Sequence, residues 1–299
     1  MDTQNLRAFL LVAETGSFSA AAEALHLTQP AISKRVAQLE MQLDASLFDR
    51  IGRTISTTEA GEALLPHARA VHLEIQAAEQ SVRDLSGDVA GKLKLATSHH
   101  VGLHRLPPVL DFFSKTYPAV QLDIAFMDSE QAYELTLRGE AELAIVTLAP
   151  QPVQHVITHP IWPDPLDFMV RGEHPLAGRK NLGLAELSEH PAILPGLGTY
   201  TGQIVKQLFD QRTLPIQVTM TTNYLETLRM MASVGLGWTV LPRSMCDKSL
   251  VRLPLKDARI ERTLGALHHE SRSLSRAAGA FLNALHSVGQ VPTNCPPAI

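Results

Sequence analysis

Cysteine and long apolar runs are scarce in this sequence of 299 residues. The two cysteines, Cys246 and Cys295, are too few for a disulfide framework and are typical of a reducing compartment. The apolar runs fall well short of the roughly 20 residues that cross a bilayer. The opening Met1–Asp2 also lacks the basic flank of a signal peptide. We therefore expect a cytoplasmic protein with no membrane partner.

An excess of positive charge is also missing. The net charge is −4, and residues 1–60 carry five basic and seven acidic side chains. This balance excludes a surface that binds nucleic acid through a broad basic field. Any such binding must come from a local arrangement of side chains.

The common short motifs of catalysis are absent as well. The sequence contains no G-x-S-x-G, no P-loop, no G-x-G-x-x-G after a predicted strand and no H-E-x-x-H. With 13 histidines, a metal-dependent hydrolase that uses His99, His100 and His104 stays open as an alternative. His100 and His104 are four residues apart, a spacing that can bind metal on one helical face, but no third ligand is evident. We predict no catalytic site, no metal and no cofactor.

What is present begins with three short helical segments. NLRAFLLVAETG (5–16) and SAAAEALHL (19–27) have helical apolar spacing, and a tight connection leads from the second to Thr28. Thr28 is a suitable N-cap for TQPAISKRVAQLE (28–40), with Pro30 in the first turn. In this third helix Ile32, Val36 and Leu39 share one face, and no carboxylate occurs before Glu40. The order of elements predicts a helix-turn-helix.

A predicted wing and a long helix follow. DRIGRTISTTEAG (49–61) combines a glycine, a β-prone run and two arginines, which indicates a small wing. Beyond it, seven apolar residues are spaced alternately by four and three: Leu64, Ala68, Val71, Ile75, Ala78, Val82 and Leu85. A single surface helix of a globular domain could show this spacing, but its regularity favours pairing with a second copy.

After a break at 86–92, predicted strands and helices alternate. Strand patterns such as KLKLATS, VQLDIAF, AELAIVTL and LDFMVRG are separated by helical ones such as LPPVLDFFSKTYP and SEQAYELTLRGE. PAILPG, QVTMT, GWTVLP and TLGALHH continue the series. This alternation predicts an α/β domain with a parallel or mixed sheet covered by helices.

The sequence resembles the LysR-type transcriptional regulators, a bacterial family. The resemblance spans nearly the whole chain and is densest at 18–61, where Q-P-A-[VI]-S, L-E-x-x-L, L-F-x-R and T-x-A-G occur in the family's order. Weaker similarities are EHPLA (173–177) and GLGWTVLP (235–242). The chain departs from the family at Asp44, where glycine is usual, and at Lys34–Arg35, so the operator sequence does not transfer.

The resemblance implies three parts. These are a winged helix-turn-helix DNA-binding domain at 1–58, a dimerising linker helix at 59–87 and an effector-binding domain at 88–299. The last part is expected to be a two-lobed α/β domain like the periplasmic binding proteins. Lobe one would comprise about 92–161 and 266–290, and lobe two about 162–265.

The resemblance also implies the function. It predicts a sequence-specific transcriptional regulator whose operator binding or activation responds to a small metabolite between the lobes. The implied partners are double-stranded DNA, further copies of the chain in a dimer and a tetramer, and RNA polymerase. A solute-binding protein would also explain the two lobes, but it needs a secretion signal and leaves residues 1–86 without a role.

Candidate DNA contacts come from the third helix and the wing. Gln29 can bond adenine through two hydrogen bonds, and Ser33 can reach a base or a phosphate. Lys34 and Arg35 can read guanine or meet phosphate, and Arg50 and Arg53 are suited to backbone or minor-groove contact. The complete set predicted to bind DNA is Thr28, Gln29, Pro30, Ser33, Lys34, Arg35, Arg50 and Arg53.

Candidate effector contacts lie where predicted strands end and helices begin, because ligands of two-lobed α/β domains sit at such positions. They are small polar residues, glycine and imidazoles, which suit a carboxylate or phosphate, and we therefore expect a small anionic effector of unknown identity. For residues such as Thr97 and Ser98, helix capping is an equally good explanation. The predicted set is Thr97, Ser98, His99, His100, Ser129, Thr147, Gly198, Thr199 and Asn223.

Overall fold

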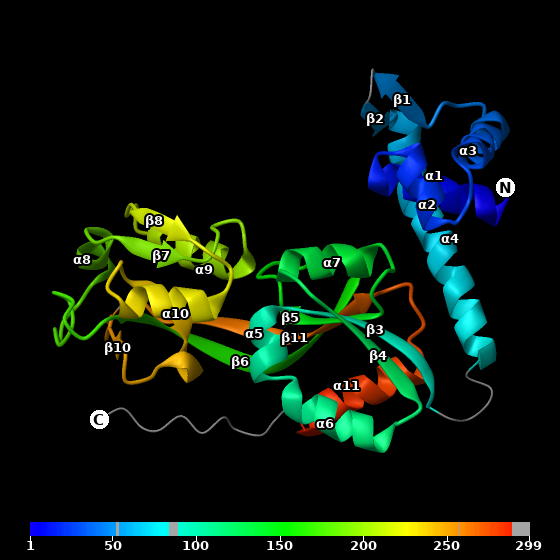
Figure 1. The fold of residues 1–299 in the computed structure, drawn as a ribbon. Helices are drawn as coiled ribbons and strands as arrows, with labels where there is room; N and C mark the ends of the chain where they lie inside the picture. The colour runs from blue at the N-terminus through cyan, green and yellow to red at the C-terminus, as the bar shows by residue number, and fades with distance from the viewer. Residues whose placement is uncertain (52–53, 84–88, 257, 289–299) are drawn as a thin grey trace. The chain divides into compact units, whose positions relative to one another are not determined.

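The computed structural model describes residues 1–51, 54–83, 89–256 and 258–288. These residues form two compact units, one of residues 1–83 with 271–275 and one of residues 89–270 with 276–288. Each unit is described by itself below, and Figure 1 labels their elements. None of the described helices is long and apolar enough to span a membrane.

The N-terminal unit begins with three helices, α1 (Thr3–Thr15), α2 (Phe18–Ala24) and α3 (Gln29–Leu43). The Asp2 carboxylate caps α1, and the Ser17 hydroxyl caps α2 by accepting from the Ala20 amide. Buried side chains of all three helices meet in one core, where Phe9 and Phe18 pack against Phe48. The predicted helix-turn-helix is therefore present.

The wing is a two-stranded hairpin of β1 (Phe48–Ile51) and β2 (Thr54–Thr57), paired antiparallel. Residues of the family motif hold it in place. The Glu40 carboxylate accepts from the Leu47 amide at 2.8 Å, and the Thr58 hydroxyl donates to the Ser46 carbonyl at 2.6 Å. At Gly61 an added Cβ would lie 2.3 Å from the Leu47 carbonyl oxygen, so the close approach requires glycine.

The long helix α4 (Glu59–Arg83) carries the predicted apolar seam. Its beginning packs inside the unit, because Ala68 is buried and Leu64 is partly buried against the helix-turn-helix core. Further along, Val71, Ala78 and Val82 are exposed, Val82 to 68%. The seam thus divides into a part used within the chain and a part left on the surface, and Leu85 lies outside the described residues.

The C-terminal unit is built on a mixed sheet. Its described strands run in the order β10-β6-β11-β5-β3-β4, with β9 also paired to β6, and β7 and β8 form a separate parallel pair. The strands are β3 (Gly91–Thr97), β4 (Val120–Phe126), β5 (Leu143–Thr147), β6 (Val156–Val170), β7 (Ala192–Leu194), β8 (Val218–Thr221), β9 (Thr239–Pro242), β10 (Val251–Arg252) and β11 (Ile260–His269).

Helices cover the sheet on both faces. Near β3, β4 and β5, helices α6 and α11 lie together on one face and α7 lies on the other (Figure 1). The described helices of this unit are α5 (His99–His104), α6 (Pro107–Thr116), α7 (Ser129–Leu137), α8 (Leu184–Ser188), α9 (Tyr200–Asp210), α10 (Leu225–Ser233) and α11 (Arg276–Val288). This arrangement confirms the expected mixed sheet covered by helices.

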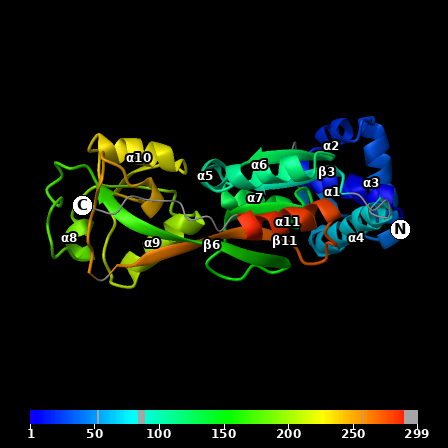
Figure 2. The same cartoon turned by 90° about the horizontal axis from the view of Figure 1, so that it is seen from below.

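Two long antiparallel strands, β6 and β11, run from one lobe of the unit to the other (Figure 2). Their register shifts between Leu264 and Gly265. One lobe contains β3, β4, β5 and α7, and the other contains β7, β8, α9 and α10. The second lobe has its own core, in which the buried Trp238 stacks on Phe209 with ring centroids 5.7 Å apart.

The strand predicted from the sequence in this region was shorter than β6. It placed a strand at LDFMVRG, whereas β6 already begins at Val156 and contains Pro160, Pro163 and Pro165. Proline argues against a strand because it cannot donate to the ladder. Here it is tolerated because residues 156–165 of β6 pair with β11 on one side, while the pairs with β9 begin only at Leu166 and those with β10 only at Met169.

Candidate DNA interface and effector cleft

Helix α3 presents a polar face to solvent. Gln29, Pro30 and Lys34 are exposed, while the opposite face buries Ile32, Val36 and Leu39, as the apolar spacing predicted. Thr28 stands at the N-cap position and is exposed, but its side chain makes no capping hydrogen bond among the described residues. Thr28 is thus the N-cap residue of α3, as predicted, but without a hydrogen bond from its side chain to the described helix.

Hydrogen bonds order part of this face. The Gln29 amide donates from Nε2 to Ser33 Oγ at 2.9 Å, which links two predicted DNA contacts one helical turn apart. Arg35 donates from Nη2 to Gln4 Oε1 at 2.7 Å, so its guanidinium is directed toward α1. Lys34 extends from the exposed face between them. The face is thus partly preorganised for contact with an extended partner.

The side chains of the two wing arginines lie outside the described part of the structure. Arg50 lies in β1 opposite Ile55, and its side chain is outside the described part of the structure. Arg53 falls at 52–53, outside the described residues. Their predicted contacts with DNA stay predictions.

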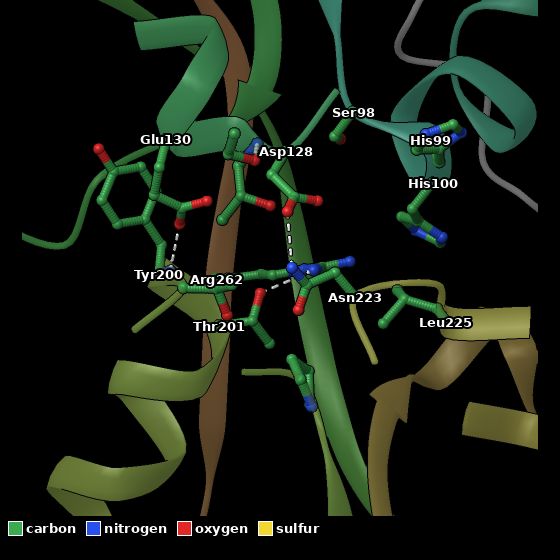
Figure 3. Close-up of a pocket in the computed structure, with 14 residues that line it drawn as sticks. Ser98, His99, His100, Asp128, Glu130, Tyr200, Thr201, Asn223, Leu225 and Arg262 are labelled. Carbon is green, nitrogen blue, oxygen red and sulfur yellow. Dashed lines mark hydrogen bonds between the residues drawn. The ribbon is translucent and has the colours of Figure 1, made fainter. Parts of the chain in front are cut away.

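A cleft lies between the two lobes of the C-terminal unit (Figure 3). One wall comes from the ends of β3 and β5 and the start of α7, and the other from the start of α9 and the segment before α10. Its lining is mostly polar: Ser98, His99, His100, Asp128, Ser129, Glu130, Thr147, Pro195, Thr199, Tyr200, Thr201, Asn223, Leu225 and Arg262.

Hydrogen bonds cross this cleft from lobe to lobe. Glu130 accepts from the backbone amide of Tyr200, the first residue of α9, at 2.5 Å. Asp128 accepts from the Asn223 side-chain amide at 2.6 Å. Figure 3 shows both bonds as dashed lines. Carboxylates of one lobe thus bind N–H donors of the other.

A buried charged cluster forms the base of the cleft. Asp164 accepts from Arg262 at 2.8 Å and from Arg105 at 3.2 Å, so two guanidinium groups share one carboxylate. Arg262 also donates to the Thr201 hydroxyl at 2.9 Å, yet its Nη2 is buried and has no hydrogen-bond partner among the described residues. The cleft is therefore lined by an arginine, Arg262, whose Nη2 can still donate a hydrogen bond.

His100 lies beside this cluster as a neutral imidazole. Its Nε2 is 4.0 Å from Asp164 Oδ2, but its burial, and next the positive charge of Arg262, lower the pKa of His100 to about 2. The charged pairs at the base of the cleft therefore leave an excess of one positive charge.

Known proteins share both units. The family model for the bacterial regulatory helix-turn-helix protein, lysR family, matches residues 3–62, and the model for the LysR substrate binding domain matches residues 86–290. The chain belongs to the LysR family. A RuBisCO operon transcriptional regulator of Acidithiobacillus ferrooxidans is 30% identical, over 97% of this chain and 95% of that protein.

Solved structures show the same fold. A full-length OxyR variant from Pseudomonas aeruginosa has a TM-score of 0.69 at 23% identity, covering 96% of this chain and 98% of that one. Full-length CbnR in complex with its target DNA has a TM-score of 0.57 at 20% identity, covering 95% and 98%. This LysR-family chain is thus a transcriptional regulator with a DNA-binding helix-turn-helix domain and an effector-binding domain. The hydrolase and solute-binding alternatives are not supported.

The LysR-family cleft gathers most of the predicted effector residues. Ser98, His99, His100, Ser129, Thr147, Thr199 and Asn223 line it, and their contact with a ligand stays a prediction. Thr97 does not line it, because its side chain is fully buried and its hydroxyl donates to the Ile145 carbonyl at 2.7 Å. Gly198 also lies outside the lining, and its carbonyl accepts from the Gln203 side chain.

Several residues that line the cleft of the regulator were not predicted from the sequence. Asp128 and Glu130 flank the predicted Ser129, and Tyr200 and Thr201 follow the predicted Thr199, so attention to neighbouring helix starts could have found them. Arg262 had no local signal, because it lies within a strand and reaches the cleft only through the packing of β11 against β6.

Proposed function

We propose that this regulator binds operator DNA through paired α3 helices, and that a small effector with an anionic group controls it from the interlobe cleft. The effector would also carry hydrogen-bond donors. The observation that supports this class of ligand most directly is the unused Nη2 of Arg262.

The charge of the buried cluster favours an anion. Arg105 and Arg262 share the single carboxylate of Asp164, while His100 is neutral. A buried charge without a full counterion is costly, and a buried N–H without an acceptor adds to that cost. A carboxylate or phosphate oxygen at Arg262 Nη2 would offset both.

The carboxylates that line the cleft indicate that the ligand also carries hydrogen-bond donors. Glu130 binds the Tyr200 amide at the start of α9, a position where helix geometry favours an anion. An anionic group of the effector could replace Glu130 there. Glu130 and Asp128 would then face the ligand, and carboxylates accept hydrogen bonds. Hydroxyl or ammonium groups on the effector would satisfy them.

The exposed part of the α4 seam supports dimerisation. Val71, Ala78 and Val82 are apolar and exposed along one face of this helix, and Ile75 between them is partly exposed. Pairing with the same surface of a second copy would remove them from water. Two copies would then present two α3 helices to a duplex. We propose a tetramer made of two such dimers, cytoplasmic location and contact with RNA polymerase as further features of this function.

Thermal unfolding followed by tryptophan fluorescence tests the effector class. Both tryptophans, Trp162 and Trp238, are buried in the C-terminal unit, so their signal reports on that unit. A panel should pair hydroxy- and amino-carboxylates and phosphate esters with their neutral amides or alcohols. We expect anionic members to raise the Tm of the wild type but not of Arg262→Met.

Arg243→Met is the matched control, because Arg243 pairs with Asp167 and does not line the cleft. This variant should respond to anions as the wild type does. Stabilisation by neutral members alone would refute the anionic effector. Genome-wide mapping of bound DNA would supply the operator, and the genes beside it would suggest the metabolite.

A further inference from the structure

Two histidines and a glutamate come together beside the effector cleft. His100 and His104 lie one turn apart on α5, with ring centroids 4.9 Å apart. Glu226 lies in the first turn of α10, in the other lobe, and its Oε1 is 2.7 Å from His104 Nε2. Within the described residues, one ligand atom from each of these three side chains lies within 4.8 Å of the others.

His100 is the unusual member of this group. Its side chain is only 6% exposed, and neither ring nitrogen has a hydrogen-bond partner among the described residues. Buried polar groups are nearly always satisfied, so an unsatisfied one requires an explanation. An imidazole nitrogen that has no hydrogen-bond partner is free to bind a metal ion.

We propose that His100, His104 and Glu226 bind one divalent transition-metal ion, of the zinc type, that joins the two lobes. Two imidazoles and a carboxylate are a common zinc ligand set, and the fourth position is left for water. With metal–nitrogen bonds of about 2.0–2.1 Å, tetrahedral ligands lie about 3.3 Å apart. The present separations of up to 4.8 Å therefore need to shrink by roughly an ångström or more.

The surroundings allow the ion to enter and be neutralised in part. His104 is 43% exposed and Glu226 is 38% exposed, so solvent reaches the group from one side. Glu226 contributes one negative charge directly. Asp164, at 4.0 Å from His100, offsets one of the two nearby guanidinium charges of Arg105 and Arg262. The proposed metal site shares His100 with the lining of the effector cleft, whereas the proposed anionic effector contacts Arg262, which is not a metal ligand.

Cobalt titration of the full-length protein tests the site. Co²⁺ in a tetrahedral nitrogen and oxygen site absorbs visible light strongly, and Zn²⁺ should displace it and remove the absorption. We expect one Co²⁺ per chain in the wild type. His104→Ala and Glu226→Ala each remove a ligand from the surface of the molecule and should weaken binding at least tenfold, since even outer-shell changes have that effect.

His155→Ala is the matched control. His155 and Glu270 form another exposed pair, with 2.5 Å between Nδ1 and Oε1, outside the proposed site. Its Co²⁺ spectrum should equal that of the wild type. Absence of a visible spectrum in the wild type, or a spectrum that persists unchanged in both His104→Ala and Glu226→Ala, would overturn the proposal.

A second measurement shows whether a variant loses metal binding because it loses its fold. Urea unfolding followed by the fluorescence of Trp162 and Trp238 should show a cooperative transition in the metal-free variants as in the metal-free wild type. Zn²⁺ should stabilise the wild type and His155→Ala but neither His104→Ala nor Glu226→Ala. Anion stabilisation should persist after chelation of metal, so that failure of the metal site and failure of the anionic effector are separate outcomes.

Discussion

Replacing Gln29 by alanine should weaken binding to the operator selectively. Gln29 is exposed at the start of α3, and its amide is oriented by the hydrogen bond to Ser33 at 2.9 Å. In a major groove, a glutamine amide at this position can donate to and accept from one adenine. Random DNA does not present that adenine in register, so the substitution should change the affinity for random DNA only slightly.

The magnitude follows from the number of contacts. A bidentate contact between a side chain and a base contributes about 1–3 kcal/mol of discrimination, which is about 5- to 150-fold in Kd. A dimer places one Gln29 on each half-site, so the two losses should add to about 2–6 kcal/mol. Ser33→Ala removes the partner that orients Gln29 and should cost less, about 0.5–1.5 kcal/mol for each chain.

Fluorescence anisotropy with an operator duplex and a scrambled duplex of equal length measures both effects. The salt concentration must be the same throughout, because phosphate contacts make affinity depend strongly on salt. Lys34→Ala is the control, since loss of a phosphate contact should weaken both duplexes and reduce the salt dependence. An equal loss on both duplexes for Gln29→Ala would refute its role in reading bases.

Three further predictions concern stability. Gly61→Ala places a Cβ 2.3 Å from the Leu47 carbonyl and should destabilise the N-terminal unit by about 1–3 kcal/mol in circular dichroism melts. Asp44 ends α3 at φ +50°, so Asp44→Gly should stabilise this unit by about 0.5–1 kcal/mol, and Asp44→Asn separates the charge effect from the backbone effect. Burial lowers the pKa of His159, so below the usual value of 6.5 the unfolded chain binds a proton that the folded chain does not. Urea unfolding followed by tryptophan fluorescence should therefore show stability falling as pH decreases from 8 to 5, less steeply in His159→Gln; an identical slope would contradict this.

The N-terminal unit was the part that local sequence described best. Its helices carry their own caps and apolar stripes, and the proline at position 30 and the motif residues around it mark where α3 begins. The structure adds why some of those motif residues occur. Glu40 and Thr58 make hydrogen bonds that position the wing, and Gly61 admits the Leu47 carbonyl.

The C-terminal unit was predictable in class but not in detail. Alternating patterns indicated the strands and helices, yet the prolines of β6 concealed the first half of that strand, because whether a strand tolerates proline depends on which of its edges is paired. Most of the residues predicted at strand ends and helix starts line the cleft. Thr97 was misplaced because the last residue of a strand can point either into the cleft or into the core.

The sequence by itself determined the family, the helix-turn-helix and the α/β class of the second unit, because these depend on periodicity and on motifs close together in the chain. Tertiary structure decided which side chains meet. Arg262 reaches the cleft, Glu130 binds the start of α9, and Glu226 lies beside His100 and His104. Each of these contacts joins residues more than 60 positions apart, where no local pattern carries information and only packing sets the distance.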